Sequence, residues 1–237
     1  MTNRISDISL RTAAIVAGVS ILVMTIAAVV ATDFVLGHLV VPGDAAATTG
    51  NIDASGMLFR AGVFSWIVVL ICDVMAAWGL YVFLRPVNRS LSLIMAWVRL
   101  VYAAMLGAAV YNLVVVLLLV RGDYSRVFGI NHLQAQVMLH LDAFDSTWSI
   151  GLVVFGIHIL LLGYLAFKSG YVPRIFGVLL VIASFGYFII NSINILYDGN
   201  ENIKTIIGWI FIIPMVVGEV GLGLWLLIRG VKVRLER

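Results

Sequence analysis

The chain has 237 residues, of which 62% are hydrophobic and only 11% are charged, and its mean hydropathy is +1.11. Soluble domains carry roughly 25% charged residues, so this charge content is too small to cover a water-soluble globule. The composition therefore excludes a soluble enzyme, a nucleic-acid-binding protein and a disordered chain. The single cysteine, Cys72, excludes an intrachain disulfide and every cysteine-based metal centre.

Six apolar stretches are long enough to cross a bilayer, which takes about 20 residues in a helix. We predict spans at about residues 12–37, 57–84, 91–120, 142–167, 175–196 and 205–228. Because helices satisfy their own backbone hydrogen bonds in lipid, the predicted fold class is all-α, a polytopic six-helix transmembrane bundle. Arg4, Arg11 and Ala31 are also features of a signal peptide, but the first stretch is too long for one and is expected to remain as a span.

The connections are short, apart from the one at residues 121–141. Its apolar residues recur at helical spacing and predict an amphipathic helix at the membrane interface: Leu133, Val137, Met138 and Leu141. Asp44 is a candidate N-cap of a short surface helix, and Asp53 or Ser55 is a candidate N-cap of the second span. No repeat or low-complexity linker divides the chain, so residues 1–237 are expected to form a single transmembrane domain.

The distribution of basic residues predicts the orientation, because cytoplasmic loops of membrane proteins are enriched in Lys and Arg. One side of the bundle collects ten of them: Arg4, Arg11, Arg85, Arg89, Lys168, Arg174, Arg229, Lys232, Arg234 and Arg237. The other side has four: Arg60, Arg121, Arg126 and Lys204. Both termini are therefore predicted to be cytoplasmic (N-in/C-in). The basic residues form no patch, so we expect membrane lipids and no nucleic acid as partners.

Several blocks of the sequence together resemble a known family. The most specific are Leu84–Leu91 (LRPVNRSL) and Ser169–Arg174 (SGYVPR), and further blocks lie at residues 41–48, 58–60, 72–74 and 160–165. Over nearly the whole chain the sequence is similar to the bacterial membrane-protein family filed as domain of unknown function 4386. The resemblance implies a multi-pass protein of the bacterial plasma (inner) membrane. It brings no established activity, substrate or catalytic residue.

Four ionisable residues are predicted to lie at one depth, about 12–16 Å from the cytoplasmic ends of their helices at the α-helical rise. They are Asp73, Arg99, His158 and Glu219, which we call the inner charged layer. Each needs a reason, since a charge at the bilayer centre costs at least about 2.5–3.5 kcal/mol on the insertion scale. Asp73 and Arg99 lie on consecutive antiparallel spans and are expected to pair. Glu219 and His158 are then expected to share one extra proton.

The inner charged layer has three interpretations: a buried network that fixes the helix register, a binding site for a ligand or ion, or a catalytic site. Gly218, Gly221 and Gly223, beside Glu219, permit close helix packing. Pro214, one turn earlier, is able to kink the helix and free a backbone carbonyl, which favours a site. The small residues Ala103, Ala104, Gly107 and Ala108 form a face that indicates helix packing, and this face is not evidence of dimerisation.

A second polar layer is predicted toward the other face, where His140, Asp142 and Asp145 open the fourth span. These three resemble a carboxylate–imidazole metal set, which His38 would complete. The alternatives are helix capping, which favours acidic residues at a helix N-terminus, and a substrate vestibule. Asp33, Asn112, Asn191, Asn194 and Tyr197 are predicted to lie in the same layer.

Three functions are compatible with the sequence. The favoured one is binding or transport of a small or lipid-like ligand at the inner charged layer, with proton coupling. The second is an intramembrane enzyme acting on a lipid through His140, Asp142 and Asp145, although no strong catalytic motif supports it. The third is a non-catalytic accessory or scaffold subunit. No mid-span lysine for retinal and no glycine-rich phosphate loop is present, so no cofactor is expected.

Overall fold

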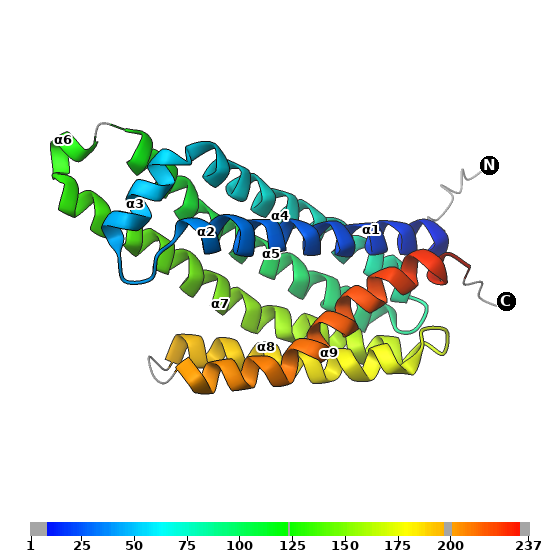
Figure 1. The fold of residues 1–237 in the computed structure, drawn as a ribbon. Helices are drawn as coiled ribbons and strands as arrows, with labels where there is room; N and C mark the ends of the chain where they lie inside the picture. The colour runs from blue at the N-terminus through cyan, green and yellow to red at the C-terminus, as the bar shows by residue number, and fades with distance from the viewer. Residues whose placement is uncertain (1–8, 123, 197–200, 233–237) are drawn as a thin grey trace, which may run out of the picture.

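The computed structural model describes residues 9–122, 124–196 and 201–232, and every regular element in these ranges is helical (Figure 1). The elements are α1 (Leu10–Val29), a π-helical segment (Val30–Leu36), α2 (Gly37–Leu39), α3 (Ala45–Ala54), α4 (Gly56–Leu84), α5 (Arg89–Arg121), α6 (Tyr124–Phe128), α7 (Ile130–Lys168), α8 (Arg174–Leu196), α9 (Glu201–Ile228) and a 3₁₀ turn (Gly230–Lys232).

Within the described residues, six helical segments are long and apolar enough to cross a membrane. They are Leu10–Leu39, Gly56–Leu84, Arg89–Arg121, Ile130–Lys168, Arg174–Leu196 and Ile206–Lys232. The prediction of an all-helical fold with six apolar spans is therefore confirmed. The N-in/C-in orientation and the single domain over residues 1–237 stay predictions.

The fourth span differs most from its prediction. It begins at Ile130 and continues without a break to Lys168, so the amphipathic helix predicted in the connection exists but is continuous with the span, and the predicted start of the span near residue 142 is wrong. The apolar residues at helical spacing do form a buried helix face, since Leu133, Val137 and Leu141 are buried. No Pro or Gly lies between residues 130 and 142 to end the helix. The amphipathic segment is thus the first part of α7, which packs there against α3 and α5.

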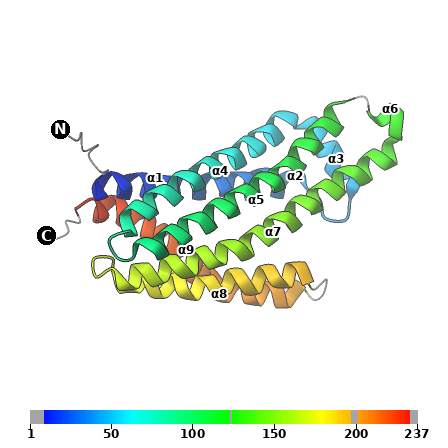
Figure 2. The same cartoon turned by 180° about the vertical axis from the view of Figure 1, so that it is seen from behind.

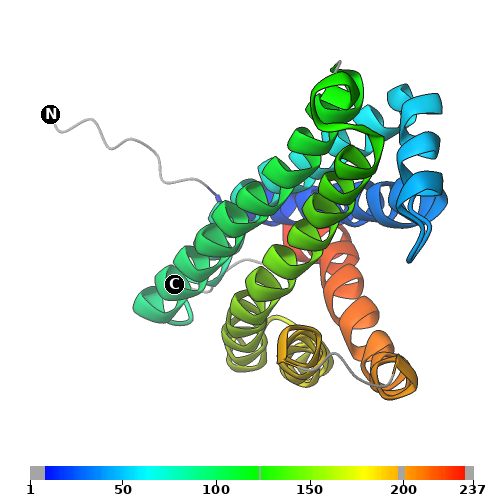
Figure 3. The same ribbon diagram turned by 90° about the vertical axis from the view of Figure 1, so that its left-hand side faces the viewer.

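The long helices pack mostly in chain order, α1 on α4, α4 on α5, α5 on α7, α7 on α8 and α8 on α9 (Figures 1 and 2). The chain closes on itself where α9 contacts α1. Helix α1 begins and α9 ends at the same end of the bundle (Figure 1). Figures 1 and 3 show that α9 starts beside α8, away from α1, and changes direction before it reaches α1. Pro214 lies inside α9, where the missing N–H and the ring favour a bend.

Glycines set the closest helix contacts, because they let two backbones approach. A Cβ at Gly18 of α1 would lie 2.9 Å from the Gly223 carbonyl of α9, so these two glycines bring α1 and α9 together toward the end where α1 begins and α9 ends. A Cβ at Gly163 of α7 would likewise lie 2.9 Å from the carbonyl of Gly177 of α8. The predicted packing role of Gly223 is confirmed.

The turns at the helix ends are fixed by side chains. Asp44 caps α3 as predicted, since its Oδ1 accepts a hydrogen bond of 2.8 Å from the Ala47 amide. Ser55 occupies the N-cap position of α4 without a side-chain cap. Between α7 and α8, the Tyr171 hydroxyl donates to the Phe83 carbonyl at 2.8 Å, and burial raises the pKa of this hydroxyl. This bond ties the loop to the end of α4.

Candidate functional site

Asp73 and Arg99 form the predicted ion pair inside the bundle. Arg99 Nη2 of α5 donates to Asp73 Oδ1 of α4 over 2.7 Å, and the two side chains are only 2% and 1% exposed. The same Nη2 also contacts the Met24 sulfur of α1 at 3.2 Å. Two charges of opposite sign are therefore held together by three helices, away from solvent.

His158 of α7 extends this pair into a three-residue network. Its Nε2 lies 2.9 Å from Arg99 Nη1, and its Nδ1 lies 3.0 Å from the Met95 carbonyl oxygen. A guanidinium only donates and a carbonyl only accepts. His158 is therefore neutral, with its proton on Nδ1. The expectation that His158 shares a proton with Glu219 is corrected by this geometry, because both of its ring nitrogens are engaged elsewhere.

Glu219 of α9 has a different partner, one that sequence reasoning missed. The Tyr187 hydroxyl of α8 donates to Glu219 Oε1 over 2.6 Å. Among the described residues, no basic side chain lies within salt-bridge distance of this carboxyl group. The signal that could have identified Tyr187 is a tyrosine in the middle of an apolar span, because its buried hydroxyl needs a partner.

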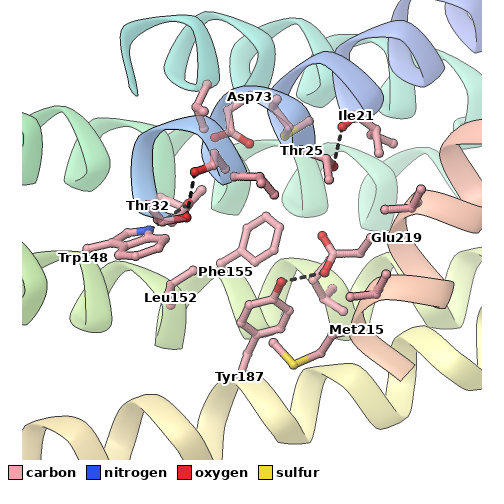
Figure 4. A pocket seen from close by; sticks show the side chains of 18 of the residues that line it. Ile21, Thr25, Thr32, Asp73, Trp148, Leu152, Phe155, Tyr187, Met215 and Glu219 are labelled. Atoms are coloured by element: carbon pink, nitrogen blue, oxygen red, sulfur yellow. Dashed lines mark hydrogen bonds between the residues drawn. The ribbon is translucent and has the colours of Figure 1, made fainter. Parts of the chain in front are cut away.

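A cavity of about 580 Å³ lies between these groups, with walls from α1, α4, α5, α7, α8 and α9. Its volume is within the range of small-molecule sites. Asp73, Arg99 and Glu219 line it, and Figure 4 shows Tyr187, Phe155 and Glu219 pointing toward one another. His158 contacts Arg99 but does not itself line the cavity. Most of the wall is apolar or aromatic, and the aromatic members are Trp66, Tyr102, Trp148, Phe155, Tyr187 and Trp209.

Three buried polar atoms in the cavity wall have no hydrogen-bond partner among the described residues: Asp73 Oδ2, Arg99 Nε and Trp66 Nε1. Buried polar side-chain atoms are nearly always paired, and an unpaired one costs about 1–3 kcal/mol. All three atoms are shielded from the cavity as well as from solvent, so they are a cost of burying these side chains, the ion pair among them, and not contacts for a ligand.

The cavity opens to the outside of the bundle between α1 and α9. Four of its lining residues are also strongly exposed on the outside of the bundle: Val29 (42%), Ile212 (44%), Val216 (52%) and Trp209 (69%). The opening lies on the side where α9 diverges from α1, away from the close contact at Gly18 and Gly223. On the α1 side it is bordered by Thr32, in the π-helical segment. π-Helical turns often occur at functional sites.

The outer polar layer does not assemble the candidate metal set of His140, Asp142 and Asp145. His140 Nδ1 lies 3.0 Å from Asn112 Oδ1, and Asp142 is exposed. In the ranges that the structure covers, no group of three or more His, Cys, Asp or Glu side chains has the arrangement of a metal site. The spacing of three residues along one helix does not determine which residues of neighbouring helices they contact. His140 contacts Asn112 of α5 and therefore does not join the two aspartates.

Asp145 instead lines a second cavity, of about 480 Å³, with Asn191 and Asn194 of α8. This arrangement agrees with the vestibule interpretation of the outer layer. Trp148 and Leu152 line both cavities and so separate the polar vestibule from the charged cavity. His38 is exposed and does not line either cavity. Tyr197 lies outside the described residues.

The six apolar helices and the charged cavity define a multi-pass helical membrane protein. The chain belongs to the family described as domain of unknown function (DUF4386), whose pattern it matches over residues 16–230. It is similar to an uncharacterized protein of the archaeon Archaeoglobus fulgidus, with 34% identity over 174 residues that cover 72% of this chain and 83% of the relative. No solved structure matches the chain. The family is confirmed, whereas a bacterial origin stays a prediction, because this relative is archaeal.

Proposed function

We propose that the protein binds and transports a small lipid-like molecule in the cavity that contains Asp73, Arg99 and Glu219. The observation that carries the proposal is an apolar cavity of about 580 Å³ whose lining includes one carboxyl group, Glu219, without a basic partner among the described residues. Apolar walls with a few convergent polar groups are the usual composition of a ligand site. A carboxyl group beside an internal space and without a basic partner destabilises a bundle that serves only as a scaffold.

The route into the cavity favours a ligand that dissolves in the membrane. The opening between α1 and α9 is bordered by exposed apolar residues, among them Val29, Ile212 and Val216. A molecule in the bilayer would reach the charged groups there without crossing water. The polar vestibule beyond Trp148 and Leu152 offers a second route, toward water. Two routes of opposite polarity suit the transfer of an amphiphilic molecule between the membrane and an aqueous side.

Proton coupling at Glu219 is part of the proposal. The charged and titratable groups around the cavity are listed by helix: Asp73 on α4, Arg99 and Tyr102 on α5, His158 on α7, Tyr187 on α8 and Glu219 on α9. The lining residues of α1 are uncharged, among them Thr25. Asp73 and Arg99 neutralise each other, and His158 is neutral. An ionised Glu219 would leave one unbalanced charge in an apolar space. A proton on Glu219 removes it, and its release would couple binding to proton movement.

We also propose that both termini face the cytoplasm and that the protein lies in the plasma membrane, because the basic residues collect on the side of the termini. Single cysteines in a Cys72→Ala background test this orientation. Gly50 and Ser90 are exposed at opposite ends of the bundle. A membrane-impermeant maleimide is expected to label Gly50→Cys on intact cells, and Ser90→Cys only after permeabilisation. The reverse pattern would contradict the orientation.

Native mass spectrometry of the purified protein tests ligand binding. The expected result is an adduct of small-molecule mass that survives mild detergent. Ala28 lines the cavity, whereas Ile26, two residues away on α1, is 66% exposed on the outside. Ala28→Trp is expected to fill the cavity and remove the adduct, while Ile26→Trp is expected to keep it. Equal adducts in both variants would place the bound molecule outside the cavity and refute the proposal.

A further inference from the structure

The charges around the cavity indicate which class of ligand it accepts. Arg99 is bound to Asp73 at 2.7 Å, and His158 is neutral because it accepts from Arg99 and donates to Met95. Among the described residues that line the cavity, Glu219 is then the one charged group without a partner of opposite charge. When Glu219 is ionised, the formal sum is one negative charge. A ligand with an anionic head would meet Glu219 without a free cation to offset it.

The surroundings of Glu219 suit a positively charged group. The Tyr187 hydroxyl holds Oε1 at 2.6 Å, which fixes the carboxyl group and leaves Oε2 without a hydrogen-bond partner among the described residues. Figure 4 shows the carboxyl group directed toward the side of the cavity where Tyr187 and Phe155 lie. These two rings meet edge to face, with centroids 5.1 Å apart and planes at 82°. The two rings therefore form an aromatic surface beside the Glu219 carboxyl group.

Aromatic rings attract cations through their negative faces, and this cavity already contains one such contact. Arg99 Cζ lies 5.2 Å from the centroid of the Phe155 ring. Tyr102 packs on Phe155 at 4.7 Å, and Trp66 packs on Trp148 at 4.8 Å, so aromatic rings continue along the wall. Aromatic groups combined with one carboxylate are the means by which proteins recognise ammonium groups with hydrocarbon substituents.

We propose that the ligand is a lipophilic cation, an amine or quaternary ammonium with an apolar tail, whose positive charge lies against Glu219 beside Tyr187 and Phe155. The inference rests on the proposed function and specifies its ligand class. The apolar remainder of the cavity, including Ile21, Met215 and Val220, holds the tail. The ammonium group could belong to a free amphiphile or to the headgroup of a zwitterionic lipid, since both present the same charge to Glu219.

Competition binding on the full-length protein in dodecyl maltoside micelles tests the inference, because this detergent carries no charge. The probe is radiolabelled decyltrimethylammonium. The competitors share its ten-carbon tail and differ in the head: the neutral isostere with carbon in place of nitrogen, decylphosphocholine, and decyl sulfate. The wild type is expected to bind the cation at least tenfold more tightly than the neutral isostere, a difference of about 1.4 kcal/mol, and to bind decyl sulfate most weakly. Competition by decylphosphocholine would identify a lipid headgroup as the source of the ammonium.

Glu219→Gln is the central variant, because it removes the charge and keeps an oxygen for the Tyr187 hydroxyl. It is expected to weaken binding of the cation about tenfold and to leave the neutral isostere unchanged. Glu219→Asp retains the charge and is expected to retain the preference for the cation, which excludes a loss caused by misfolding. Asp33→Asn makes the matched carboxyl-to-amide change at an exposed position outside the cavity, and it should bind like the wild type.

Two outcomes would overturn the inference in different ways. If the wild type binds the cation and the neutral isostere equally, or decyl sulfate most tightly, and Ala28→Trp abolishes this binding, the cavity binds ligands but does not select cations. If no competitor binds the wild type better than it binds Ala28→Trp, the proposed function fails together with the inference. Retained tenfold preference for the cation in Glu219→Gln would show that the charge is recognised elsewhere.

Discussion

Arg99→Met tests the ion pair at the centre of the bundle. Methionine keeps much of the apolar stem of arginine and removes the guanidinium. Asp73, which is 1% exposed, then loses the hydrogen-bond partner that it has among the described residues and is left with two unpaired carboxylate oxygens. The Nε2 atom of His158 also loses its donor. We expect the free energy of unfolding to fall by about 3–5 kcal/mol, the usual loss when one member of a buried pair is removed.

A second substitution separates the charge from the packing. In Asp73→Leu/Arg99→Met both charges are replaced by apolar groups of similar size, so no uncompensated charge remains in the bundle. Such replacements are often neutral or stabilising, and we expect the double variant to recover most of the loss. The coupling energy between the two positions should then exceed about 2 kcal/mol, within the range observed for residues in contact.

Unfolding by sodium dodecyl sulfate in mixed micelles, followed by circular dichroism, measures these differences. The four proteins of the cycle are the wild type, the two single variants and the double variant. If Arg99→Met loses less than about 1 kcal/mol, or if the double variant loses the sum of the two single losses, the charges are not energetically coupled. Either result would refute the reasoning that the pair is buried and isolated from water.

The remaining predictions concern packing and the loop between α7 and α8. Gly177→Leu is expected to destabilise the protein by about 1–3 kcal/mol, because a Cβ there would lie 2.7 Å from Phe167 Cβ; Gly208→Ala, where no atom lies within 4 Å, should cause no loss in the same unfolding assay. Tyr171→Phe removes the hydrogen bond to Phe83 and should cost about 1 kcal/mol. Burial raises the pKa of Tyr171, so its contribution is complete below about pH 10 and declines at higher pH, where the unfolded tyrosine ionises. The stability difference between the wild type and Tyr171→Phe should therefore shrink above about pH 10, and a constant difference at all pH values would contradict the assignment.

The sequence predicts the spans well because their signal is compositional: long apolar runs bounded by polar turns require no knowledge of neighbours. Counting residues along each helix also brought Asp73 and Arg99 to one depth, and they are in contact. Depth does not fix the rotation of a helix about its axis. That is why His158 was expected beside Glu219 although its ring nitrogens contact Arg99 and Met95.

Other features depend on contacts that no local pattern encodes. The hydroxyl of Tyr187 finds Glu219 only because α8 and α9 pack side by side. His140 pairs with Asn112 of α5, so the spacing of His140, Asp142 and Asp145 along α7 gave a metal set that the fold does not assemble. The π-helical segment at Val30–Leu36 likewise has no signature in hydropathy. The opening between α1 and α9 arises from the path of α9 and is a property of the assembled bundle.

A high-resolution cryo-electron microscopy map of the protein in lipid nanodiscs tests the central claim most directly. The account expects density for a bound molecule in the cavity between α1 and α9, within hydrogen-bonding or ion-pair distance of Glu219 and lying against Tyr187 and Phe155. It also expects Arg99 to remain on Asp73 and His158. A bundle in which side chains close the cavity, or in which Glu219 pairs directly with a basic residue of the protein, would contradict the account.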